Sequence, residues 1–225
     1  MFQGFSGATV DFLWGIRFNN ERSWFEAHKE EYQTHLLAPM KALSSEVYDR
    51  FHERHPDLPL VSKVSRIYRD ARRLFGRGPY KDHLWMSLLR PHEEGAFAPV
   101  FWFELTPDNW SCGMGFWQAP ALTMAKFRAR MDRDPAPMEE LTRRLNRQDR
   151  FVLEGPEYRR PKTPSAPALA PWYAKKSFSL GHEEAHCQLL WSHDLADALV
   201  ADYEFLLPYY QYLDLLEGDP DPRGE

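Results

Sequence analysis

The hydrophobic positions in the early part of the chain recur with a helical period. This spacing predicts one helix over residues 9–18, a second that begins at Asn20 or Ser23, and a third from Pro39 to His55. We expect the third helix to restart at Pro39, because proline is tolerated in the first turn of a helix but not in its interior. Thr9 is expected to cap the first helix.

From residue 60 the pattern changes toward alternation, which is typical of half-buried strands. Strands are predicted over 61–68, 84–89, 100–105 and 110–117. Residues 106–109, Thr-Pro-Asp-Asn, are a strong turn signal. The third and fourth of these strands should therefore form an antiparallel hairpin.

The rest of the chain is mainly helical in its spacing. Helices are predicted over 119–131, 136–147 and 194–216, with one further strand over 175–180. The prolines between Gly155 and Pro171 predict an extended arm on the surface. Because the strands are grouped in the middle and the helices at the N- and C-terminal ends, we predict an α+β fold. It would form a single domain over 1–217 with a central, mainly antiparallel sheet, followed by a disordered tail, 218–225.

Composition narrows the class of protein. A chain of 225 residues, 43% of them hydrophobic, can bury one sizeable core. The net charge of −5 does not suit a protein that coats nucleic acid, so any anion site has to be local. With two cysteines, no signal-peptide pattern and no uninterrupted apolar run of about 18 residues, we expect a cytoplasmic protein without a membrane segment.

One basic segment departs from the acidic balance. Residues 63–81 carry seven basic side chains against the single acid Asp70, 7 − 1 = +6: Lys63, Arg66, Arg69, Arg72, Arg73, Arg77 and Lys81. Arginine binds phosphate or carboxylate through two parallel hydrogen bonds, and Gly76 and Gly78 would let the backbone approach such a ligand closely. Asp70 is placed to orient a guanidinium or, less favoured, to act as a general base. The candidate ligand-binding residues are Arg66, Tyr68, Arg69, Asp70, Arg72, Tyr80 and Lys81.

The basic segment predicts a site for a small phosphorylated or nucleotide-like anion, and whether a reaction follows stays open. The alternative is a nucleic-acid or protein interaction module on the same basic face, whose affinity would fall steeply with salt. A third interpretation is a solvated surface on which the arginines pair with some of the 33 acidic residues. The sequence has no phosphate-binding glycine loop, dinucleotide fingerprint or Ser-His-Asp order, so no cofactor is expected, and it does not indicate an oligomeric state.

Residues 182–186, His-Glu-Glu-Ala-His, match the pattern in which two histidines one helical turn apart bind zinc and the glutamate activates water. The match follows a predicted strand and Gly181, and His193 does not stand at a usual third-ligand spacing. A zinc-dependent hydrolase that uses His182, Glu183 and His186 is therefore a remote alternative. We expect a solvated polar connection here and no bound metal.

Aromatic side chains fill the predicted strands. They are expected to form the core, although one face, including Trp85, could line a pocket that stacks a base. Glu104 lies among them, and a buried carboxylate needs a partner. We therefore expect Arg66 or Lys176 to pair with Glu104 if this side chain faces inward.

Three short motifs occur in a recognisable order: Asn-Asn-Glu-Arg-Ser-Trp-Phe at 19–25, Ser-Arg-Ile-Tyr-Arg-Asp at 65–70, and Gly-Pro-Tyr-Lys at 78–81. Together with Gly-Met-Gly-Phe-Trp at 113–117 and Lys-Ser-Phe at 176–178, they resemble the DUF2461 family over nearly the whole chain. The resemblance implies a compact α+β domain of unassigned biochemical function. It matches Arg66, Arg69 and residues 79–81 directly, whereas residues 71–77 depart from the longer lysine-containing loop that members usually carry.

Overall fold

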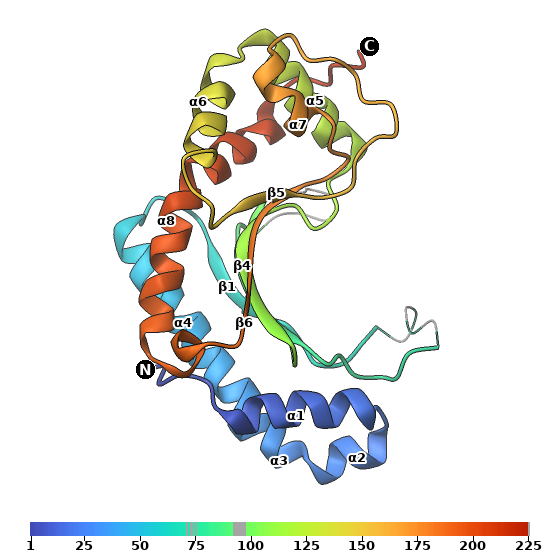
Figure 1. Cartoon of the computed structure of the whole chain (residues 1–225), viewed down its shortest axis with the longest axis vertical. Helices are drawn as coiled ribbons and strands as arrows, with labels where there is room; N and C mark the ends of the chain where they lie inside the picture. The colour runs from blue at the N-terminus through green and yellow to red at the C-terminus, as the bar shows by residue number, and fades with distance from the viewer. Residues whose placement is uncertain (71, 73, 75, 92–97, 225) are drawn as a thin grey trace. The chain divides into compact units, whose positions relative to one another are not determined.

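The structure is a computed structural model that describes residues 1–70, 72, 74, 76–91 and 98–224 (Figure 1). The chain forms two compact units. The first unit consists of Met1–Leu89, Trp102–Cys112 and Glu183–Ala201, and the second consists of Arg90–Phe101, Gly113–His182 and Asp202–Glu225. Because segments of the two units alternate along the sequence, the chain passes from one unit to the other several times.

The first unit begins with helix α1, Gly7–Phe18. Ser6, not Thr9, is its capping residue, because the α1 helix starts two residues earlier than predicted. Thr9 instead lies in the first turn, fully buried, where its hydroxyl accepts a hydrogen bond from the Ser6 amide at 3.1 Å. The same hydroxyl donates to the His35 carbonyl at 2.6 Å.

The next helical stretch runs through Pro39 without the predicted break. It comprises α2 (Arg22–Ala27), α3 (Lys29–Glu31), the π-helical segment η1 (Tyr32–Leu37) and α4 (Ala38–Arg54). Pro39 stands in the first turn of α4, as expected, and has no amide to offer the His35 carbonyl four residues earlier. The hydrogen bond from Thr9 satisfies that carbonyl instead.

Six strands form one antiparallel sheet, in the order β1-β2-β3-β4-β6-β5. The strands are β1 (Val61–Val64), β2 (Leu84–Leu89), β3 (Val100–Leu105), β4 (Asn109–Gly115), β5 (Val152–Glu154) and β6 (Ser179–Ala185). The predicted hairpin is confirmed: β3 and β4 are neighbours, and the Thr106 amide donates to the Asn109 carbonyl at 2.9 Å across the turn. β1 ends at Val64 rather than at Tyr68, and Tyr68 forms only an isolated bridge with Tyr80.

In the first unit, α4 packs against one face of β1 and β2. Along β2, the buried Leu84, Met86 and Leu88 alternate with a half-buried Trp85, and β3 shows the same alternation around Trp102 and Glu104. The side chains of one face are thus in the core, whereas Trp85, Trp102 and Glu104 retain partial exposure on the other face. We call this second face of β2 and β3 the open face.

The second unit contains the helices that follow the hairpin. These are α5 (Ala121–Arg133), α6 (Ala136–Leu145), the 3₁₀ turn η3 (Pro167–Leu169) and α7 (Ala170–Tyr173). Its core includes Phe127, Trp172 and Phe178, and the Arg150 guanidinium pairs with the buried Asp202 at 2.7 Å. The chain then passes through η4 (Gln188–Trp191) and α8 (Asp194–Asp214) and ends in η5 (Leu215–Gly218).

The predicted α+β class is confirmed, with a few local differences. The strand expected at 175–180 is β6, shifted toward the C-terminus, and the short β5 was not predicted. Asp219, expected in a disordered tail, accepts a hydrogen bond from Arg130 at 2.6 Å. The single-domain boundary at 217 and the disorder of the remaining tail stay predictions. Within the described residues, no helix is long and apolar enough to span a membrane.

Candidate functional site

A cluster of ionisable side chains lies on the open face, around the start of β2. Lys81 and His83 precede this strand, and Trp85 lies in it. The Lys81 Nζ is 3.8 Å from the centroid of the Trp85 ring, and the His83 ring stacks on Trp85 at a centroid distance of 5.7 Å. The three side chains therefore project to the same side of the chain.

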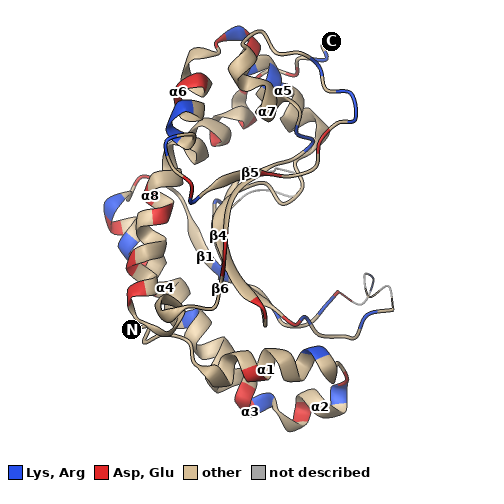
Figure 2. Cartoon of the chain, in the orientation of Figure 1, with Lys and Arg blue, Asp and Glu red and all other residues tan. Residues whose placement is uncertain are grey.

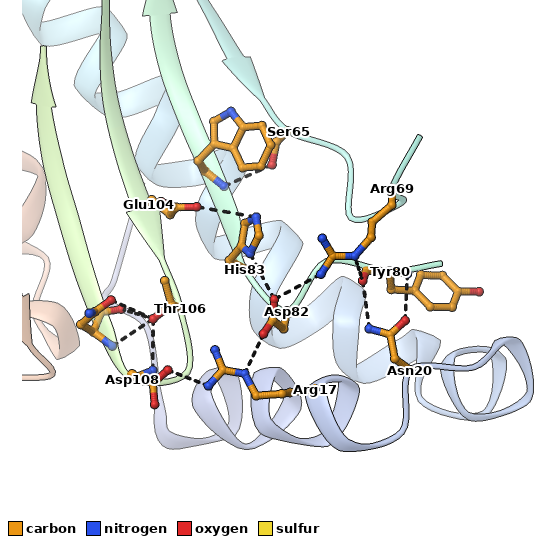
Figure 3. Close-up of polar contacts among 12 residues, drawn as sticks. Arg17, Asn20, Ser65, Arg69, Tyr80, Asp82, His83, Glu104, Thr106 and Asp108 are labelled. Carbon is orange, nitrogen blue, oxygen red and sulfur yellow. Dashed lines mark hydrogen bonds and ion pairs between the residues drawn. The ribbon is translucent and has the colours of Figure 1, made fainter. Parts of the chain in front are cut away.

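His83 stands between two carboxylates (Figure 3). Its Nδ1 is 3.2 Å from Asp82 Oδ1, and its Nε2 is 3.7 Å from Glu104 Oε1. Burial lowers the pKa of His83, an effect that Asp82 partly offsets, and burial raises the pKa of Glu104. An imidazole whose pKa is lowered thus faces a carboxyl whose pKa is raised, and such a pair is suited to exchange a proton.

Asp82 is held in its ionised form by the arginines beside it. Arg17 Nε donates to Asp82 Oδ2 at 2.6 Å, and Arg69 Nη2 is 3.5 Å from Asp82 Oδ1. Burial opposes ionisation, but the hydrogen bond from Arg17 holds the pKa of Asp82 below its ordinary value. An ionised Asp82 favours the His83 tautomer with its proton on Nδ1, which leaves the Nε2 lone pair directed toward Glu104.

Arg17 also fixes α1 to the β3–β4 turn. Its Nη1 donates to Asp108 Oδ2 at 2.6 Å, in addition to its bond with Asp82. One guanidinium therefore joins a helix, the turn of the hairpin and the segment before β2, as Figure 3 shows. These links give the cluster a rigid support.

Lys81 is half-buried and, within the residues that the structure describes, forms no ion pair. Burial, together with the positive charges of Arg69 and Arg66, lowers the pKa of Lys81 to about 8, although Glu104 acts in the opposite direction. The Lys81 amide donates to the Ile67 carbonyl at 2.7 Å and the Arg69 amide donates to the Pro79 carbonyl at 2.8 Å, so the segment that carries Arg66 and Arg69 lies beside Lys81. The basic residues of the segment thus converge at least in part.

The predicted arginines differ in their exposure to solvent and in how far protein groups already bind their guanidinium groups. Arg66 is exposed and has no hydrogen bond or ion pair among the described residues. The Arg69 side chain is 16% exposed, and its Nε donates to the Tyr80 carbonyl at 2.7 Å. Arg72 is 87% exposed and binds Asp70 through two hydrogen bonds, at 3.0 and 2.8 Å.

Asp70 therefore orients the guanidinium of Arg72, which is one of the two roles considered for Asp70. Its carboxylate also offsets much of the positive charge of Arg72. Arg73, which contributes to the +6 of the segment, lies outside the described residues. Figure 2 shows red as well as blue along the chain between β1 and β2, so acids accompany these arginines. The structure thus concentrates the candidate site on Arg66, Arg69 and Lys81.

The two predicted tyrosines have different positions. Tyr80 is buried and stacks on Phe25 at a centroid distance of 4.3 Å, and burial raises its pKa. Tyr68, at 50% exposure, is open to solvent, although its ring contacts Tyr80 at 5.3 Å. Only Tyr68 is therefore placed to touch a ligand at the surface.

Asn20 clamps the chain just before Lys81. Its Oδ1 accepts a hydrogen bond from the Tyr80 amide at 2.9 Å, and its Nδ2 donates to the Tyr80 carbonyl at 2.9 Å. Gly78 approaches so closely that a Cβ there would lie 2.2 Å from Asn20 Oδ1. This glycine is needed for the close approach of the two segments. The first and third motifs of the sequence are thus joined in space.

The expectation that Arg66 or Lys176 pairs with Glu104 is wrong. Glu104 faces His83 and the charge of Lys81, whereas Arg66 is solvent-exposed and the Lys176 ammonium lies over the Tyr158 ring. The register between neighbouring strands decides which side chains lie beside Glu104, and this register cannot be read from the sequence.

Residues 182–185 belong to β6 and are not a polar connection. In a strand, successive side chains point to opposite faces, so the helical geometry of the zinc pattern does not form. His182 Nδ1 contacts the Arg150 carbonyl at 3.0 Å, and His186 Nε2 contacts the Thr106 carbonyl at 3.1 Å. Among the described residues there is no group of three His, Cys, Asp or Glu side chains that could hold a metal ion.

Sequence reasoning missed Arg17, Asp82 and His83. A weak signal for the last two was present, because they follow Lys81 directly in a segment already singled out. No signal in the sequence pointed to Arg17, whose nearest partner is 65 residues away.

The fold and this cluster define an α+β protein with a half-buried group of acid, base and cationic side chains on the open face of an antiparallel sheet. Residues 8–212 match the family described as "Conserved hypothetical protein (DUF2461)". The match covers most of the chain, and the chain belongs to this family. No curated protein matches it.

Proposed function

We propose that the first unit binds a small phosphorylated or nucleotide-like anion at Arg66, Arg69 and Lys81. The observation that carries the proposal is the convergence of these three cations, of which Arg66 and Lys81 have no ion-pair partner in the described part of the chain. Asp82 pairs with Arg69 and offsets part of this positive charge. The cations still repel one another, and an anion that binds between them reduces that repulsion.

The surroundings suit an anion of limited size. Arg69 is held by Tyr80 and Asp82, so its orientation is set before a ligand arrives. Preorganised guanidinium groups bind phosphate oxygens with little loss of side-chain entropy. The ionised Asp82 in the same cluster disfavours a long polyanion, because its charge would repel phosphates beyond the first.

The proposal is tested by calorimetric titration with inorganic phosphate, pyrophosphate, nucleoside monophosphates and a short single-stranded oligonucleotide. Each is measured on the wild-type protein and on Arg66→Ala. A matched control is Arg160→Ala, which removes an exposed arginine from the second unit.

We expect a small anion to bind with 1:1 stoichiometry. Arg66→Ala should weaken this binding by about tenfold to a hundredfold, because a charge-assisted hydrogen bond contributes about 1.5–3 kcal/mol. Arg160→Ala should leave it unchanged. If only the oligonucleotide binds, with an affinity that falls steeply with salt, the interaction module replaces the proposal. If no anion binds, or if both variants lose affinity equally, the proposal is wrong.

A further inference from the structure

We propose that Lys81 is a Schiff-base-forming amine that reacts with an aldehyde or ketone carrying a phosphate or carboxylate group. The proposal rests on the anion site described above, because Arg66 and Arg69 would hold the anionic group while Lys81 reacts. It adds a covalent activity and a chemical class of substrate to that site.

The position of Lys81 raises the fraction of its neutral amine, which is the nucleophilic form. The side chain is half-buried, has no ion pair in the described residues, and lies beside the segment that carries Arg66 and Arg69. The Trp85 ring, whose centroid is 3.8 Å from Nζ, attracts the ammonium form and acts in the opposite direction. A lysine that is desolvated or next to another cation loses its proton more easily, and lysines of this kind form imines with carbonyl compounds. The pKa of about 8 agrees with this geometry.

Other lysines of the chain lack this combination. Lys175 binds Glu157 at 2.9 Å, Lys29 binds Glu26 at 3.3 Å, and Lys126 donates to the Glu217 carbonyl at 2.9 Å. Lys63 and Lys41 are exposed to solvent.

The neighbouring His83 and Glu104 supply the proton transfers that imine formation needs. The Nζ lone pair adds to the carbonyl carbon, and the carbonyl π electrons move to oxygen, which takes a proton from the carboxyl of Glu104. The nitrogen loses a proton to the Nε2 of neutral His83. The imidazolium returns this proton to the hydroxyl, which leaves as water, and the iminium nitrogen gives its remaining proton to the Glu104 carboxylate. One amine and one carbonyl thus give one imine and one water, and no oxidant or reductant is required.

The charges of these groups are close enough to act on one another. Lys81 lowers the pKa of His83, and Glu104 favours the protonated form of Lys81. Asp82 fixes the ring of His83 from the other side at 3.2 Å. We regard Asp82 as a positioning residue, since it acts through His83.

The test uses pyridoxal 5′-phosphate, which is an aldehyde with a phosphate group, and pyridoxal, which lacks the phosphate. The full-length protein is incubated with each probe at pH 7.5, the imine is reduced with borohydride, and the labelled lysines are identified by peptide mass analysis. At this pH, a pKa of about 8 leaves roughly two hundred times more free amine than an ordinary lysine has. We therefore expect Lys81 to be labelled at least tenfold faster than Lys63, its exposed neighbour in β1.

Protection and substitution complete the design. Inorganic phosphate or pyrophosphate should slow the labelling of Lys81 by pyridoxal 5′-phosphate, and pyridoxal should react more slowly. Lys81→Arg should abolish the fast label, and Lys63→Arg should not. His83→Asn should slow imine formation at Lys81 without changing the affinity for inorganic phosphate, a split that a merely structural role would not give.

The outcomes separate the two proposals. If phosphate binds but Lys81 is labelled no faster than Lys63, the Schiff-base proposal is overturned and the anion site stands. If Lys81 is labelled quickly but pyridoxal reacts as fast as its phosphate ester and phosphate gives no protection, Lys81 is a reactive amine and the anion site is refuted. Fast, phosphate-protected labelling supports both.

Discussion

The Asn20 clamp gives a sharp prediction for stability. Asn20→Ala removes both hydrogen bonds that join this side chain to Tyr80, each 2.9 Å long. The two losses are unequal, because the Tyr80 carbonyl keeps a second donor, Arg69 Nε at 2.7 Å, whereas Asn20 is the only acceptor found for the Tyr80 amide among the described residues.

The magnitude follows from this asymmetry. Leaving a partly buried amide without an acceptor costs about 1–3 kcal/mol, and losing one of two bonds to a carbonyl costs about 0.5–1 kcal/mol. We therefore expect Asn20→Ala to lower the free energy of unfolding by about 2–3 kcal/mol. Urea unfolding with linear extrapolation measures it directly.

Asn19→Ala is the matched control. The Asn19 side chain is exposed at the end of α1 and makes one hydrogen bond, to the Gly15 carbonyl at 3.0 Å. Its loss should cost less than about 1 kcal/mol, since a solvated carbonyl regains a water partner. If the two variants unfold within about 0.5 kcal/mol of each other, Asn20 does not clamp the segment and our account of how Lys81 is positioned is wrong.

Three further predictions concern the site and its support. The affinity for sulfate, whose own charge does not change in this range, should fall about tenfold per pH unit above pH 8, because Lys81 loses its proton there. Lys81→Arg should make the affinity independent of pH in this range. A wild-type affinity that does not change with pH in calorimetry would contradict the role of Lys81 in anion binding. Gly78→Ala should destabilise the protein by about 1–3 kcal/mol in urea unfolding, because the added Cβ would collide with Asn20. Gly7→Ala is the control and should not change the stability, because the space around Gly7 is open. Equal effects of the two substitutions would count against the close approach of Gly78 to Asn20. Metal analysis of protein purified without chelator should show no stoichiometric zinc, and zinc that is lost on His182→Ala would overturn the strand-based argument.

The sequence predicted best those strands and helices in which the period of the hydrophobic residues matches the period of buried positions. The strands at 84–89 and 100–105 have the predicted bounds, because buried apolar residues recur at every second position along both, from Leu84 to Leu88 and from Phe101 to Leu105. The helix predicted from 194 also begins at the expected residue. β5 was missed because three residues are too few to show a period, and β6 was misplaced because its C-terminal half is polar.

Of the candidate site, the sequence predicted only the basic residues that are close together along the chain. Lys81, Arg66 and Arg69 were found because they are close in sequence, and charge density is visible there. His83 and Glu104 are brought together across β2 and β3, so their meeting depends on strand register. Arg17 contributes from α1, and such a long-range contact leaves no local pattern.

The bond from Thr9 to the His35 carbonyl has a consequence for how the family can vary. This hydroxyl supplies the donor that Pro39 cannot, so each of the two residues makes the other tolerable. With alanine at position 39 the helix would offer the His35 carbonyl an amide of its own, whereas valine at position 9 beside Pro39 would remove the donor that this carbonyl now has. Substitutions at the two positions should therefore be epistatic, and related sequences should change them together.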